Sequence, residues 1–169
     1  SSFRFVADIT APSVPTVNNT YSYLSSTTTV PVSWAVATDN QSVVTGYEVS
    51  IGTSAGAANT RSWQSVSGTS NTVTTVLNNG GTYYANVKAV NGAGLKSSIS
   101  SFHFLVDSTA PSVPTVSNTY SYLTSTSNVP IRWRAAEDGQ SGVTGYEVSI
   151  GASAGATDNV GWTSVAGLA

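Results

Sequence analysis

The sequence VTGYEVSIG occurs twice in this chain, at residues 44–52 and again, unchanged, at residues 143–151. A shift of 99 positions aligns residues 1–70 with residues 100–169 without a gap, and 45 of the 70 aligned pairs are identical. A period near 100 residues is too long for a helical solenoid or a propeller blade. It matches the length of a β-sandwich domain, so the repeating unit is predicted to be a whole domain.

The repeat divides the chain into three predicted segments. Residues 1–7 correspond to residues 100–106, the end of the repeat, and are predicted to be the final strand of a preceding domain. Residues 8–106 form one complete domain, and residues 107–169 form the first part of a second, truncated domain. The strands missing from this second copy either lie outside the sequence or come from another chain, and a longer parent array is implied.

A short connector precedes each copy. The pattern Asp-x-Thr-Ala-Pro stands at residues 8–12 and returns at residues 107–111. Pro12 and Pro15 favour extended backbone and remove amide donors. We therefore expect a stiff connector, unlike a flexible Gly/Ser linker.

The amino-acid composition argues against several classes of binding partner. Only 8% of the residues are charged, against roughly 25% in typical soluble domains. The net charge of −2 offers no field that would attract a nucleic acid or an anionic membrane. The absence of cysteine excludes disulfides and thiolate metal sites within the chain. No apolar stretch is long enough for a membrane-spanning helix, so we expect no membrane insertion by this segment.

Short, turn-bounded stretches with alternating apolar residues predict an all-β chain. The predicted strands cover residues 28–36, 44–51, 62–66, 72–76, 83–90 and about 96–106. The residues predicted to share one face of their strand are Val30, Val32, Trp34, Val36, Tyr47, Val49, Ile51, Tyr83, Ala85, Val87 and Ala89. No window has a convincing helical period.

These residues carry a resemblance to the fibronectin type III domain, in the form found in tandem arrays of bacterial surface proteins. Trp34 stands on the second predicted strand, and residues 46–49 read Gly-Tyr-Glu-Val on the third. Leu77 precedes the turn into the sixth strand, and residues 83–94 match the pattern Tyr-x-x-x-Val-x-Ala-Val-Asn-x-x-Gly.

The resemblance covers about residues 12–106 and begins again at residues 111–169. It implies tandem seven-stranded β-sandwiches of the immunoglobulin-like type, in an extracellular or cell-surface protein of bacterial origin. The loop at residues 91–95 contains no Arg-Gly-Asp, so binding of the integrin type is not implied.

The tryptophans are the first candidates for ligand contact. Trp34 is in phase with Val30, Val32 and Val36, and Trp133 is its counterpart, so we interpret both as core residues. Trp63 and Trp162 follow a polar loop on an edge strand, where each would either stack on a sugar ring or cover the sheet edge and pin the loop. Tyr83 is predicted to form the hydroxyl-to-backbone corner typical of such sandwiches.

Acidic residues near the connectors raise the question of calcium, which takes six to eight oxygen ligands. The candidate ligands are Asp8 and Asp107 in the connectors, and Asp39, Glu137 and Asp138 in the loop after the second strand. The competing interpretation is that these side chains cap turns by accepting bonds from nearby amides.

Catalytic chemistry has few candidate residues. His103 is the only histidine, and its counterpart in the other copy is Arg4. A triad needs a base beside a nucleophile, and no phosphate loop or metal-ligand spacing is present. We therefore predict no enzyme activity, no catalytic residues and no cofactor.

The first functional hypothesis is a non-catalytic stalk or spacer in an adhesin-like or fibre-like surface protein, whose partners are neighbouring repeats. A second is a module that binds a surface glycan or protein through Trp63 and Trp162 or through residues 91–95. A third is an accessory domain of a secreted polysaccharide-degrading enzyme.

Overall fold

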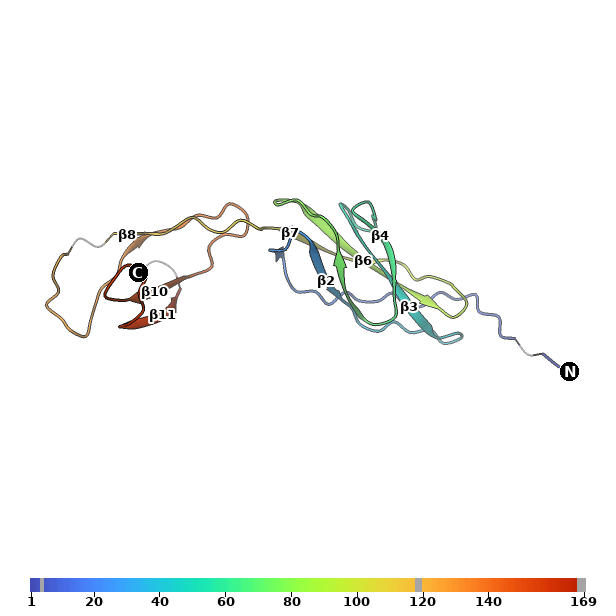
Figure 1. Cartoon of the computed structure of the whole chain (residues 1–169). Helices are drawn as coiled ribbons and strands as arrows, with labels where there is room; N and C mark the ends of the chain where they lie inside the picture. Colours follow the sequence, from blue (N-terminus) through green and yellow to red (C-terminus); the bar gives the residue numbers. More distant parts are fainter. Residues whose placement is uncertain (4, 118–119, 167–169) are drawn as a thin grey trace. The chain divides into compact units, whose positions relative to one another are not determined.

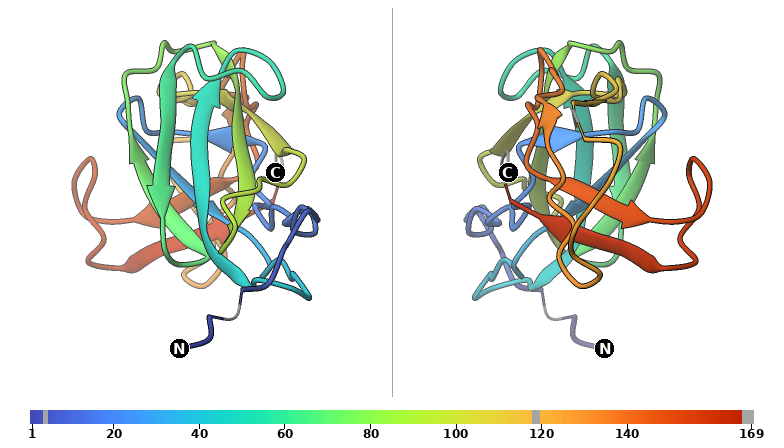
Figure 2. Two further views of the ribbon diagram at one scale, coloured as in Figure 1. Left: turned by 90° about the vertical axis from the view of Figure 1, so that its right-hand side faces the viewer. Right: turned by 90° about the vertical axis from the view of Figure 1, so that its left-hand side faces the viewer.

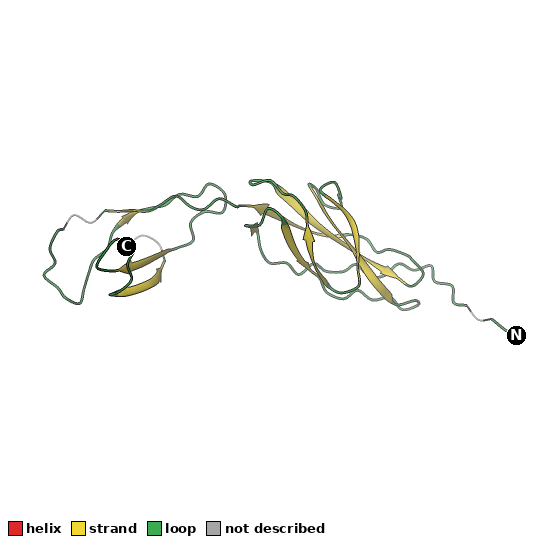
Figure 3. Ribbon diagram, viewed as in Figure 1, coloured by secondary structure: helices red, strands yellow, loops and turns green. Residues whose placement is uncertain are grey.

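The structure, a computed structural model, describes residues 1–3, 5–117 and 120–166. Arg4 and residues 118–119 and 167–169 belong to the first and third predicted segments and lie outside the described residues. The described part contains strands and no helix (Figure 1, Figure 3), so the prediction of an all-β chain is confirmed. It also contains no helix that is long and apolar enough to cross a membrane. The chain divides into two compact units, Ser1–Ser108 and Thr109–Ala169.

The first unit is built from two sheets, which Figure 2 shows from two sides. The larger sheet has the order β1-β7-β6-β3-β4. Its strands are β1 (Tyr23–Leu24), β3 (Val44–Gly52), β4 (Arg61–Val66), β6 (Thr82–Asn91) and β7 (Ser100–Val106). The smaller sheet pairs β2 (Thr29–Ser33) with β5 (Ser70–Thr74). All neighbours are antiparallel except β1 and β7, which run parallel.

The core lies between the two sheets and follows the two-residue period of the strands. On β3, Tyr47, Val49 and Ile51 are buried, as the sequence predicted. They join buried residues of both sheets in one cluster, which also contains Val30, Val32, Trp34, Val73, Tyr83, Ala85, Val87, Ala89, Phe104 and Val106. Two facing apolar surfaces are thus removed from water together, which is the main favourable contribution to folding.

The predicted position of Val36 is wrong, because this side chain is 72% exposed. The strand ends at Ser33, so the alternation does not continue beyond Trp34. Ala37 enters the core instead, and its N–H donates a hydrogen bond to the hydroxyl of Tyr47 at 2.9 Å. A tertiary contact here overrides the local period.

The predicted corner at Tyr83 is confirmed. The backbone N–H of Asn78 donates to the Tyr83 hydroxyl at 3.0 Å, across the turn that leads into β6. The Tyr83 ring also packs close to Gly81, where an added Cβ would lie 2.7 Å from the ring. The hydroxyl is therefore satisfied although the side chain is buried.

The second unit holds two short antiparallel pairs among its described residues. These pair β8 (Thr115–Val116) with β9 (Trp133–Arg134), and β10 (Tyr146–Ile150) with β11 (Val160–Val165). Trp133 packs on Tyr146 with ring centroids 5.4 Å apart, as Trp34 packs on Tyr47 at 5.3 Å. The repeated sequence thus produces repeated local geometry.

The loop after β3 generates a prediction about Gly52. A Cβ at this position would lie 2.3 Å from the backbone oxygen of Ala57, which cannot move without breaking the loop. We expect Gly52→Ala to lower the free energy of unfolding by about 1–3 kcal/mol, measured by chemical denaturation. The control is Gly68→Ala, whose added Cβ meets no atom within 4 Å. Equal effects of the two substitutions would contradict the close approach at Gly52.

Candidate binding face

The outer face of the larger sheet carries the side chains that alternate with the core residues. It contains three groups of side chains, which differ in their chemistry. They are a polar row (Ser50, Asn86 and Ser101), a charged cluster with one tryptophan (Glu48, Lys88, Lys96 and Trp63) and an aromatic row (Tyr23, Tyr84, His103 and Leu105).

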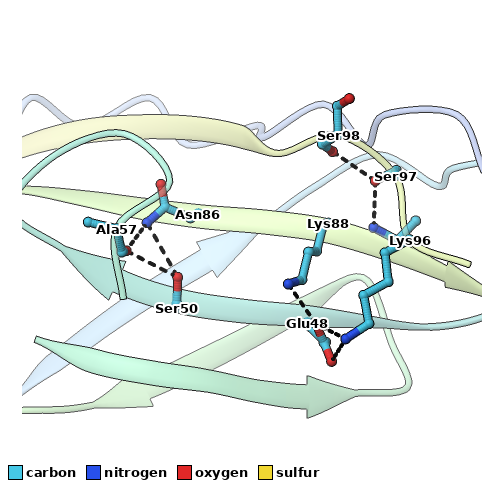
Figure 4. A network of polar contacts seen from close by, with 9 residues as sticks. Glu48, Ser50, Ala57, Asn86, Lys88, Lys96, Ser97 and Ser98 are labelled. Carbon is cyan, nitrogen blue, oxygen red and sulfur yellow. Dashed lines mark hydrogen bonds and ion pairs between the residues drawn. The ribbon is translucent and has the colours of Figure 1, made fainter. Parts of the chain in front are cut away.

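Asn86 holds the loop of residues 53–59 against the outer face of the sheet. Its Oδ1 accepts from the N–H of Gly56 at 2.8 Å and from the hydroxyl of Ser101 at 2.7 Å. Its Nδ2 donates to the oxygen of Ala57 at 2.7 Å (Figure 4). The amide has no exposed surface, and its polar atoms find partners within the fold, as buried polar atoms must.

Glu48 joins two lysines on the same face (Figure 4). Its carboxylate lies 2.9 Å from Lys88 Nζ and 2.8 Å from Lys96 Nζ. The hydrogen bond from Lys96, with that from Lys88, holds the pKa of the Glu48 carboxyl below its usual value. Lys88 Nζ also lies 3.8 Å from the centroid of the Trp63 ring, which is the geometry of a cation–π contact.

This contact bears on the two candidate stacking residues. The Lys88 ammonium lies over one face of the half-buried Trp63 ring, so it would have to move before a sugar could stack on that face. This contact gives Trp63 a partner within the fold, and both interpretations of its role stay predictions. Trp162 is 60% exposed and lines an open pocket of the second unit with Trp133 and Val148. Its role as a stacking residue stays a prediction.

The aromatic row was not identified from the sequence. Tyr84 stands directly opposite His103, and their ring centroids are 5.8 Å apart. Tyr23 stands opposite Leu105 on the neighbouring strand pair. Strand parity is the signal that would have found this row, because the inward position of Tyr83 requires Tyr84 to point outward.

The structure brings together two of the candidate calcium ligands, Asp8 and Asp39, around Asn91. The Asn91 Nδ2 group lies 2.8 Å from Asp8 Oδ2, 3.1 Å from Asp39 Oδ2 and 3.0 Å from the backbone oxygen of Thr10. The other end of the amide accepts bonds from backbone N–H groups in residues 93–95. Asn91 is only 2% exposed, so a buried amide ties the connector to the body of the first unit.

The remaining acidic candidates are spread over both units. Asp39 and Asp138 each accept bonds from two or three following backbone N–H groups, which is the turn-capping role considered above. Asp107 is buried at the end of the first unit, and Glu137 is exposed in the second. Within residues 1–3, 5–117 and 120–166, no three His, Asp or Glu side chains form a group that could hold a metal ion.

The chain is similar in sequence to a known domain family and to a known protein. Residues 13–103 match the family model "Fibronectin type III domain". The chain is 34% identical over 96% of its length to "Chitinase A1" of Niallia circulans, and it spans 22% of that protein's length. It is also similar to the solution structure of the sixth fibronectin type III domain from human fibronectin type III domain containing protein 3. That likeness has 23% identity and a TM-score of 0.39, and it covers 67% of this chain and 97% of the other.

The lysine over Trp63 gives a testable prediction. Lys88→Ala removes the cover of the ring, so acrylamide should quench Trp63 more strongly and the Trp63 indole N–H signal should shift in NMR spectra. The free energy of unfolding should fall by about 0.5–1.5 kcal/mol. Lys96→Ala is the matched control, because it removes one ion pair of Glu48 and leaves the ring covered. An unchanged Trp63 signal in Lys88→Ala would contradict the contact.

The lowered pKa of Asp39 predicts that the stability of the fold depends on pH. Hydrogen bonds from the backbone N–H groups of Ser42 and Gln41, and from Asn91, lower the pKa of Asp39 from its ordinary value of 3.8. The folded state therefore favours the ionised carboxylate. The contribution of Asp39 to stability is complete well above pH 3.8 and is lost as the pH falls through the lowered pKa of the folded state. Between about pH 5 and pH 2, the free energy of unfolding should fall more in the wild type than in Asp39→Asn. Parallel curves for the two proteins would contradict this role.

Proposed function

Because this chain belongs to the fibronectin type III family, we propose that it is a non-catalytic accessory segment that spaces the functional domains of a secreted polysaccharide-degrading enzyme. The observation that carries the spacing role is the way the first unit anchors both of its connectors. The similarity to Chitinase A1, which extends over 96% of the chain, supports the association with such an enzyme.

The connector that enters the first unit is fixed to it at two places. Asn91 holds Asp8 and Thr10, as described above. Further along, Ser13 and Thr38 exchange bonds: the Ser13 N–H donates to the Thr38 oxygen at 2.9 Å, and the Thr38 N–H donates to the Ser13 hydroxyl at 2.8 Å. A segment anchored in this way has little freedom to bend where it meets the domain.

The connector that leaves the first unit is anchored as well. The Asp107 N–H donates to the Leu24 oxygen at 3.0 Å, and the Ser108 N–H donates to Asn79 Oδ1 at 2.8 Å. In the second unit, the Ser112 N–H donates to the backbone oxygen of Glu137 at 2.9 Å. Only residues 109–111 lie between these anchors, and the third of them is a proline. Such a joint favours a spacer of fixed length over a flexible tether.

The family supports a non-catalytic role. Fibronectin type III domains are generally non-catalytic. His103 stands opposite Tyr84 on the sheet, and its ring lies 5.8 Å from the Tyr84 ring, centroid to centroid.

A stalk in a cell-surface protein is the second candidate function, because anchored connectors suit both settings. The flanking sequence of the parent protein distinguishes them. A neighbouring polysaccharide hydrolase domain is expected under the proposal, whereas a cell-wall anchor and an adhesin head would favour the stalk.

The absence of cysteine allows a direct test of the spacing role. Ser54→Cys and Ser153→Cys place two spin labels at equivalent exposed sites, one in each unit. We expect a narrow distribution of label-to-label distances from pulsed electron spin resonance. Replacement of Thr109, Ala110 and Pro111 by glycine in the same protein should broaden it.

The glycine variant also gives the distance distribution that is expected for a flexible joint. If the wild-type distribution is as broad as that of the glycine variant, the anchored connectors do not set the spacing and the proposal is wrong. Circular dichroism of both labelled proteins checks that the substitutions leave the sheets folded.

A further inference from the structure

The aromatic row occupies the outer face of three neighbouring strands. Tyr23 on β1 lies opposite Leu105 on β7, and His103 on β7 lies opposite Tyr84 on β6. Paired residues point to the same side of a sheet, and adjacent strands lie about 4.8 Å apart, so the row is roughly 10 Å wide. Tyr23 is 47% exposed, and His103 is also exposed. The aromatic row, which consists of these four side chains, is called the aromatic platform below.

Charge on the outer face of the larger sheet is gathered in one cluster of paired side chains. The charged side chains on the outer faces of β3 and β6, Glu48 and Lys88, are bound to each other, and Lys96 completes their cluster. The platform itself contains no Asp, Glu, Lys or Arg. An anionic polymer would need basic side chains that the platform lacks. The face is therefore suited to a neutral ligand.

The chemistry of the platform matches a pyranose ring. A pyranose presents C–H groups on its ring faces and hydroxyl groups around its edge, so it can stack on an aromatic ring while its hydroxyls remain hydrated. Tyrosine combines an apolar ring with a polar tip, which suits such a ligand. The platform is wide enough for more than one sugar ring, which favours a chain over a single sugar.

The backbone that carries Tyr84 and His103 is held by strand pairing before any ligand arrives. Tyr84 and His103 stand in the continuous ladder between β6 and β7. Two residues further along the same strands, Asn86 accepts a hydrogen bond of 2.7 Å from Ser101 and also holds the loop of residues 53–59. Little backbone ordering at Tyr84 and His103 is therefore required when a ligand binds, which preserves affinity.

We propose that the aromatic platform is a binding site for a neutral polysaccharide chain. This inference rests on the proposed function and adds to it the surface that would touch the polymer. The segment would then hold the enzyme on its substrate as well as space its domains.

The test uses the whole 169-residue chain and suspensions of insoluble chitin and cellulose. We expect the wild type to be retained on at least one of them. Tyr84→Ala and His103→Ala should each weaken retention by about tenfold, the loss expected for one aromatic contact. Tyr84→Phe keeps the ring and should bind like the wild type.

Val76→Ala is the matched control, because Val76 is an apolar side chain, 79% exposed, that lies outside the platform. Thermal unfolding checks that each variant is folded. If Tyr84→Ala unfolds because Tyr84 is half-buried, His103→Ala still tests the platform. In NMR spectra, N-acetylglucosamine hexamer should shift the signals of Tyr23, Tyr84 and His103 in the wild type.

Three results would overturn the proposal. They are no retention of the wild type on either polysaccharide, retention that both Tyr84→Ala and His103→Ala leave unchanged, and retention on heparin alone. The spin-label experiment uses no polysaccharide, so a failure of the platform leaves the spacing role intact, and a failure of the spacing role does not imply a failure of the platform.

Discussion

The structure of the first unit depends on the strict alternation of side chains along β3, β6 and β7. Val49, Val87 and Phe104 have no exposed surface and fill the core, whereas their neighbours Glu48, Lys88 and His103 lie on the opposite face. Because the strands are paired in register, outward residues of different strands become neighbours, as Glu48 and Lys88 do. A slip of one residue would bury these charges and expose the valines, which the hydrophobic effect strongly opposes. The same register that fixes the core therefore fixes the outer face.

Much of this could be predicted from the sequence, because a two-residue period is a local property. The faces of β3 and β6 and the corner at Tyr83 follow from it. The period failed where a distant contact took over, as at Val36. Asn86 is a similar case, since parity places it outward but a loop 30 residues away buries it. Asn91 meets Asp8 across 83 positions and Asp39 across 52, and no local pattern indicates such a bond.

The candidate site shows the same limit. Trp63 stands out in the sequence as an aromatic residue on an edge strand, yet the use of its ring depends on Lys88 from another strand. The platform has the opposite character, since Tyr84 and His103 are unremarkable until the register of β6 and β7 sets them side by side. Residue type alone identifies candidates for stacking, but their access and grouping are tertiary properties. The match of residues 13–103 to the fibronectin type III family predicts the fold, but it does not predict which side chains meet on the outer face.

The anchored connectors have a consequence for how such a chain can grow. The contacts that hold the incoming connector, and those that hold the outgoing one, come from the first unit itself. A duplication of 99 residues therefore copies a domain together with both halves of its joint. A gene could then gain or lose copies by recombination, and every new copy would bring with it the contacts that hold its own connectors.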